Sequence, residues 1–416
     1  MSFVTWSIFD WTKLSRQERG IPSEMLSACR LNRFGKALII AVVLATIGGV
    51  YSQKLHLLRG DFPAFYSAAV LAGSSATADE LYGEGRQQEI QLRHWPEMKD
   101  EFLMFSYPAS VAVVLAPLSQ VGGITAKYIF TAIAFLLAAI FLFQCSRFSL
   151  VNSPWFSAGL AISFLPFLSA VTSGQLSIIL FLALLAIASE LSDREEGVRT
   201  GRLVVPFLLL GFKPNVLLAA ATAAFFLLSS GKRVLIIPLS LLVLFAHYLV
   251  GASIFSWDWP LVWFKATASF AEKDFIANGH MQSSAVDLLS NFYRYLTGDS
   301  LAFLLVVALS LMLIAVLARL YRRKLPAPVL FILLVCLGTV HFLYYDLGVL
   351  SAMFWLAASK NKRDVTWMLL TWVSVNALIV VKGSLPFQPA VIVVLAFVLY
   401  GDSLYRHQKD KMVGDG

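Results

Sequence analysis

The amino-acid sequence predicts an all-α integral membrane protein, a polytopic bundle of about 10–12 transmembrane helices. Of its 416 residues, 58% are hydrophobic and 14% are charged, whereas soluble domains carry about 45–50% apolar and about 25% charged residues. Long charge-free runs alternate with loops in which Lys and Arg are concentrated. The composition excludes a soluble fold, and the net charge of +8 indicates membrane orientation rather than nucleic-acid binding.

Eleven apolar runs approach the length that crosses the hydrocarbon core as a helix. They lie near residues 37–58, 106–121, 124–145, 154–172, 175–191, 203–229, 234–253, 300–318, 326–358, 364–381 and 386–405. The runs 203–229 and 326–358 are interrupted, which predicts broken helices there. No internal repeat is visible, so residues 37–405 are expected to form a single polytopic domain.

The charges between these runs predict the orientation of the chain. Residues 1–36 carry six basic side chains and no signal-peptide pattern, so a cytoplasmic N-terminal segment is expected, with a cytoplasmic tail at 406–416. The loops assigned to the cytoplasm, together with this segment, hold 21 of the 33 Lys and Arg residues. Segments 59–105 and 254–299 are poor in Lys and Arg and are expected to face outward, carrying short amphipathic helices.

The parity of the crossings gives a further constraint. Four apolar runs lie between the outward segment 59–105 and the inward loop at 190–202, where an odd number of crossings is required. One of the four is therefore expected to be re-entrant or interfacial.

Asp61 is the first candidate for chemistry, because it follows the first crossing on the outer side. Ionisable residues at the rim of a membrane are costly and are therefore functional candidates. The following stretch, with Phe62 and Phe65, is expected to lie on the bilayer surface. A structural alternative is that Asp61 caps this helix, since Asp before Phe-Pro is a good N-cap.

A second cluster runs from His341 to Asp346, at the outer end of the interrupted run 326–358. By topology it reaches the same face as Asp61. His341 and Tyr345 share a helix face, but Asp346 lies about 140° round, so the three line one site only if the helix breaks. An interfacial aromatic belt accounts for the tyrosines but not for Asp346, which needs a partner or a watery cavity.

Lys213 and Gln175 are weaker candidates. Lys213 lies between Gly211 and Pro214 in an otherwise apolar run, the pattern of a broken helix. It either reaches an anionic lipid phosphate or, as the more favoured alternative, snorkels to the cytoplasmic surface. Gln175 opens the run 175–191 and offers an amide and a helix N-terminus to a polar ligand.

Motifs of soluble enzymes are absent from the sequence. There is no phosphate-binding Gly-rich loop, no dinucleotide fingerprint, no His-Glu-x-x-His and no Gly-x-Ser-x-Gly. The three cysteines are far apart in sequence and form no metal-binding pattern. Any chemistry therefore needs a donor that is already activated and already in the membrane.

Short motifs in a characteristic order carry a family resemblance over roughly residues 59–350. They are Gly60-Asp61-Phe62, Phe65-Tyr66, Leu81-Tyr82-Gly83, Tyr107-Pro108, Ala116-Pro117-Leu118, Gly174-Gln175, Gly211-Phe212-Lys213-Pro214, His341 and Tyr345-Asp346. Together they resemble glycosyltransferase family 87. That family comprises GT-C-class membrane enzymes, mannosyltransferase-like, that use polyprenyl-phosphate sugars.

The resemblance implies a function and a set of roles. A sugar, mannose or another hexose, would pass from a polyprenyl phosphate to a hydroxyl of a lipid or glycan acceptor on the extracytoplasmic side of a bacterial inner membrane. Asp61 would act as the base and His341 would compensate the leaving phosphate. Residues expected to bind donor or acceptor are Tyr66, Tyr107, Gln175, Lys213, Tyr345 and Asp346. No metal or cofactor is expected, because Asp61 is not part of an Asp-x-Asp pair.

Two rival functions stay open at this point. A transporter or lipid-linked-sugar flippase also shows broken helices and intramembrane charge, but no related halves are visible here. A surface-polysaccharide polymerase or ligase is chemically close and would use a pyrophosphate-linked donor.

Overall fold

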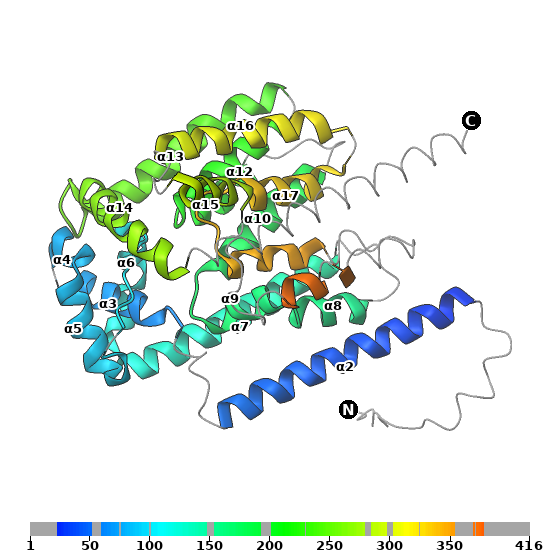
Figure 1. The fold of residues 1–416 in the computed structure, drawn as a ribbon, viewed down its shortest axis with the longest axis horizontal. Helices are drawn as coiled ribbons and strands as arrows, with labels where there is room; N and C mark the ends of the chain where they lie inside the picture. The colour runs from blue at the N-terminus through cyan, green and yellow to red at the C-terminus, as the bar shows by residue number, and fades with distance from the viewer. Residues whose placement is uncertain are drawn as a thin grey trace.

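The computed structural model describes most of the chain as packed helices (Figure 1). The described residues are 23–51, 60–74, 76–99, 101–147, 154–192, 201–228, 230–278, 284–297, 303–323, 325–353, 369–370 and 372–377. Every regular element in these ranges is helical, which confirms the all-α class. The apolar run 386–405 and the tail 406–416 lie outside the described residues.

The helices follow the chain in this order. The first half contains α2 (Ser23–Tyr51), α3 (Phe62–Gly73), α4 (Ala78–Tyr82), α5 (Glu84–His94), α6 (Ala109–Leu115), α7 (Gly123–Arg147), α8 (Pro154–Ile162), α9 (Leu165–Thr172) and α10 (Ser177–Ser192). The second half contains α11 (Gly201–Leu210), α12 (Pro214–Leu227), α13 (Ser230–Ala252), α14 (Trp259–Asn278), α15 (Ala285–Thr297), α16 (Phe303–Tyr321) and α17 (Ala327–Gly338). Short 3₁₀ helices are η2 (Pro96–Met98), η3 (Ala116–Gln120) and η5 (Tyr344–Ala352).

Three helices within the described residues are long and apolar enough to cross a membrane. They cover Gly123–Ser146, Lys232–Ala252 and Leu304–Tyr321, and only 22–28% of their most apolar windows is buried inside the protein. Large apolar side chains such as Phe143, 62% exposed, cover much of their outer surface. Apolar faces of this size are stable against lipid rather than water. The structure thus shows fewer full-length spans among these residues than the expected 10–12.

Much of the difference comes from runs that the structure divides into shorter helices, two of them where the sequence predicts a break. The run 203–229 divides into α11 and α12, and the run 326–358 divides into α17 and η5. The run 154–172 also divides, into α8 and α9, which are bent by 61°. The run 106–121 contains only α6 followed by η3. Two of the four runs that parity left ambiguous are therefore not straight spans.

The central core surrounds α17, which is buried from Pro328 to Gly338. A helix that is apolar on every face needs neighbours on every face. It packs against α10, α12 and α16. This helix accounts for an apolar run that is surrounded by protein rather than by lipid.

A second core forms around α3, which packs against α5, α6 and η3. Figure 1 shows α3 to α6 gathered at one end of the molecule, with α14 beside them. Phe62 and Phe65 are each only 1% exposed, and Ala69 and Leu71 are fully buried. The expectation that these side chains lie on the bilayer surface is wrong, because α3 is apolar on all faces and is enclosed by protein.

Two glycines clamp α3 to the start of α10. Gly60 and Gly174 both have left-handed backbones, with φ of +45° and +69°. A Cβ atom at Gly174 would lie 2.7 Å from the Cβ of Phe62, and one at Gly60 would overlap the carbonyl of Ser173. The Asp61 N–H donates to the Ser173 oxygen at 2.8 Å. Only glycine allows the two backbones to approach this closely.

Replacing Gly174 with Ala tests this clamp. Gly174→Ala combines an unfavourable φ with a steric clash, so we expect it to destabilise the protein by about 1–3 kcal/mol. Gly85→Ala is the matched control, because Gly85 is exposed in α5 with no atom within 4 Å of an added Cβ. That control should be neutral or slightly stabilising. The midpoints of thermal unfolding in detergent measure both, and equal midpoints for the two variants would contradict the clamp.

Candidate functional site

Asp61 lies at the N-cap position of α3, but its side chain makes no capping hydrogen bond. Its carboxylate instead accepts a hydrogen bond from the side-chain amide of Gln175. The residue is partly exposed, although the α3 residues that follow it are buried. Asp61 thus occupies the N-cap position without capping α3 through its side chain, and its side-chain contact links it to another candidate of the site.

Gln175 connects Asp61 to Tyr107. The Tyr107 hydroxyl donates to the Gln175 side-chain oxygen at 3.2 Å. Gln175 is only 1% exposed, so both ends of its amide are held inside the protein. Gly174 places the amide here, since its left-handed backbone turns the chain into α10. Three of the residues predicted from the sequence are thus brought together.

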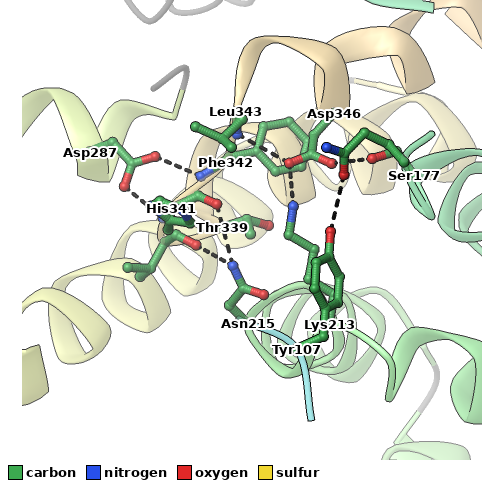
Figure 2. Close-up of polar contacts among 12 residues, drawn as sticks. Tyr107, Ser177, Lys213, Asn215, Asp287, Thr339, His341, Phe342, Leu343 and Asp346 are labelled. Carbon is green, nitrogen blue, oxygen red and sulfur yellow. Dashed lines mark hydrogen bonds and ion pairs between the residues drawn. The ribbon is translucent and has the colours of Figure 1, made fainter. Parts of the chain in front are cut away.

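Lys213 and Asp346 form a buried ion pair (Figure 2). They are 8% and 1% exposed. Lys213 precedes Pro214, which favours an extended backbone at the helix break, with φ of −134° and ψ of 85°. The Lys213 ammonium also lies 5.8 Å from the centre of the Tyr345 ring, within cation–π range.

The favoured alternative for Lys213, snorkelling to the cytoplasmic surface, is therefore wrong. Its ammonium lies inside the protein beside the Asp346 carboxylate. A buried carboxylate without a charged partner would be strongly destabilising, so the two charges need each other. The expectation that Asp346 needs a partner is confirmed. The Ser177 hydroxyl donates to the second Asp346 oxygen at 2.7 Å, and the Leu343 N–H donates to Asp346 at 3.1 Å.

The chain reverses between α17 and η5, so the break required by the His341 cluster is present. His341 has a left-handed backbone, with φ of +55°. Its N–H and that of Phe342 donate to the two Asp287 oxygens at 2.7 and 2.8 Å. The Asn215 amide donates to the Val340 carbonyl from the other side. Figure 2 shows Asp287 and Asn215 approaching this reversal from opposite directions.

In the proposed family pattern we expect Asp346 and Tyr345 to orient the His341 ring through a hydrogen bond. The Asp346 carboxylate instead bonds Lys213, Ser177 and Leu343. The carboxylate that bonds the backbone at His341 is Asp287. His341 itself is partly exposed, as Asp61 and Tyr107 are.

Tyr66 belongs to the core around α3 rather than to this cluster of polar contacts. Its hydroxyl donates to the Val121 carbonyl at 2.9 Å, and its ring lies edge-on to Trp95. It is 2% exposed, and burial raises the pKa of its hydroxyl. These contacts give Tyr66 a packing role in the core around α3.

Sequence reasoning missed Ser177, Asn215 and Asp287. Ser177 and Asn215 each lie two residues beyond a candidate, so proximity in sequence to Gln175 and Lys213 was the available signal. Asp287 is flanked by Val286 and Leu288, an acid among apolar residues like Asp346. Its assignment to an outer loop hid that signal, since acids are common in such loops.

The start of α10 joins the two carboxylate sites. Gln175 bonds Asp61, and Ser177, the first residue of α10, bonds Asp346. Side chains at the start of one helix therefore orient both carboxylates.

Comparison with known proteins gives no relative. No family model, curated protein or solved structure matches this chain. Within the described ranges, no three His, Cys, Asp or Glu side chains are grouped so that they could hold a metal ion, and the absence of a metal stays a prediction.

Removing the charge of Lys213 should reveal how strongly the pair is coupled. Lys213→Met leaves the Asp346 carboxylate buried without its cation, and we expect a loss of about 3–5 kcal/mol. Asp346→Asn in the same chain should restore part of that loss, because an amide can still serve Ser177 and Leu343. Thermal unfolding of both single variants and the double variant measures the coupling.

The exposed pair of Arg86 and Glu89 supplies the control. Their charged atoms are 3.1 Å apart, and the side chains are 53% and 49% exposed. Arg86→Met should change stability by less than about 0.5 kcal/mol. Additive losses from Lys213→Met and Asp346→Asn would show that the buried pair is not coupled.

Proposed function

We propose that this chain is a membrane glycosyltransferase of the GT-C class. It moves a hexose, such as mannose, from a polyprenyl phosphate to a hydroxyl of a lipid or glycan acceptor. The reaction takes place on the extracytoplasmic side of a multi-pass bundle in the bacterial inner membrane, with the N-terminus in the cytoplasm. It is a single inverting displacement that needs no metal or cofactor.

One observation carries the proposal. Residues from the segment 59–105, from the α11–α12 break and from the α17–η5 reversal form two sets of polar contacts, and the start of α10 contributes a side chain to each. Asp61 in the first set is partly exposed, whereas Asp346 in the second is buried. The surrounding helices carry lipid-compatible apolar faces. A lipid-linked donor and a base that meets an acceptor from outside both suit this arrangement.

The proposed step is a displacement at the anomeric carbon. Asp61 takes the proton of the acceptor hydroxyl while the acceptor oxygen attacks, which contributes on the order of 10²–10⁴ in rate. The bond from the anomeric carbon to the phosphate oxygen breaks, and its electron pair leaves with the polyprenyl phosphate. His341 compensates the charge that grows on this oxygen. Lys213, whose charge is already matched by Asp346, supports the site from within.

Direct assay of transfer tests the proposal. Purified protein in lipid vesicles is incubated with radiolabelled polyprenyl-phosphate sugars and membrane-lipid acceptors, and glycosylated product is separated by chromatography. Product from at least one monophosphate-linked sugar supports the function. Movement of a labelled donor across the vesicle without product would identify a flippase, and transfer only from a pyrophosphate-linked oligosaccharide would identify a polymerase or ligase.

Asp61→Asn separates the base from a cap. The amide keeps the size and can still accept from Gln175, but it cannot take a proton. We expect transfer to fall by at least about 10²-fold with an unchanged midpoint of thermal unfolding. Asp79→Asn, an exposed acid of the same outer segment, should retain full transfer. Near-normal turnover by a folded Asp61→Asn protein would remove Asp61 from the reaction.

His341→Asn tests the role of the imidazole without disturbing the backbone. Asn adopts the left-handed conformation of this position at little cost, whereas Ala does not. We expect kcat/KM to fall on the order of 10²-fold, as for the loss of one charge-stabilising donor. The measurement varies donor concentration at saturating acceptor. Unchanged kinetics would assign phosphate compensation to another group.

A further inference from the structure

Asp287 is a buried acid in the second outer segment that the mechanism above does not use. It is 4% exposed and lies in the first turn of α15. Both of its oxygens accept backbone N–H bonds, from His341 at 2.7 Å and from Phe342 at 2.8 Å. Its own N–H donates to the Ser284 hydroxyl at 3.0 Å. Two elements far apart in sequence therefore meet at one carboxylate.

The backbone at this contact needs support. A residue other than Gly with positive φ costs free energy and persists only where its surroundings determine it. Among the described residues, His341 is the only non-glycine with positive φ. The Asp287 carboxylate and the Asn215 amide bond the backbone on either side of this residue. The strained conformation is thus held by side chains from α15 and α12.

We propose that Asp287 is a positioning residue for sugar transfer, which holds the reversal at His341 and Phe342 so that the His341 imidazole faces the donor phosphate. This inference rests on the proposed function. It makes the outer segment 254–299 part of the site, since α15 contributes a contact that the reaction needs. Asp287 itself is not expected to touch substrate.

A carboxylate suits this position better than an amide does. Two adjacent N–H groups point to two acceptor oxygens, and both bonds are charge-assisted. Burial raises the pKa of Asp287, while these two N–H bonds and the charge of His341 oppose that rise. An Asn side chain offers one acceptor and turns its own N–H₂ toward the second backbone N–H. Asp287→Asn therefore weakens the contact with almost no change in volume.

Kinetic coupling with His341 distinguishes positioning from a general effect on folding. A misplacement of about 1 Å at a reacting group can cost about 10²-fold in rate. We expect Asp287→Asn to lower kcat/KM about 10-fold and Asp287→Ala about 10²-fold. Asp287→Asn combined with His341→Asn should be no slower than His341→Asn alone, because the imidazole that Asp287 positions is then absent. Asp258→Asn, an exposed acid of the same segment, is the control and should be unchanged.

A second readout is independent of transfer. His341 in the purified protein is modified with diethyl pyrocarbonate, and each histidine is quantified by mass spectrometry of its peptide. His94, also partly exposed and in the outer segment, serves as the internal reference. We expect Asp287→Asn to change the rate at His341 several-fold relative to His94, while Asp258→Asn does not.

The outcomes separate the two proposals. If the wild-type protein transfers no sugar but the His341 modification rate responds to Asp287→Asn, the proposed function fails and the structural coupling holds. If transfer occurs but the losses from Asp287→Asn and His341→Asn multiply, positioning is overturned. A rise in donor affinity or in the rate of transfer in Asp287→Asn would also overturn it. That result would show that the Asp287 carboxylate repels a donor phosphate that binds beside it.

Discussion

The buried ion pair between Asp346 and Lys213 is the interaction on which the rest of the site depends. A carboxylate that is 1% exposed within an apolar bundle is stable only with charge and hydrogen bonds to match it. Lys213, Ser177 and Leu343 supply these from three different parts of the chain. Each of these donors requires a helix to begin or end nearby. The need to match the charge of the buried Asp346 carboxylate thereby determines where α10, α12 and η5 begin.

The interruptions of the apolar helices follow from the same requirement that buried polar groups be paired. Non-helical backbone at membrane depth is tolerated only where protein groups satisfy it. The break before α12 places Lys213 against Asp346, and the break after α17 exposes backbone groups that Asp287 and Asn215 bond. Gly174 allows a further break by letting the chain just before α10 approach Phe62 closely. The short helices are thus a consequence of assembling polar groups in an apolar protein.

The sequence predicts the local features better than the pairings. Gly and Pro around Lys213 indicate a break, and an acid among apolar neighbours at 346 indicates a partner, because both signals are local. That Lys213 is this partner depends on packing between distant helices, so the position of its ammonium was predicted wrongly. The enclosure of α3 was missed for the same reason, since composition alone does not separate lipid from protein as an apolar surrounding. The strained backbone at His341 carries no sequence signal at all.

Asp61 and Asp346, the two acids that contact the start of α10, differ in their surroundings, and this difference bears on their roles. Environments that separate otherwise similar carboxylates commonly assign them different chemistry. Asp346 is enclosed and paired with an ammonium, so it is unsuited to meet an acceptor hydroxyl or to take its proton. Asp61 is partly exposed and is oriented by a neutral amide, which leaves its carboxylate accessible to an acceptor hydroxyl. If one of the two is the base, these contacts favour Asp61, and Asp346 acts by holding together the elements that orient it.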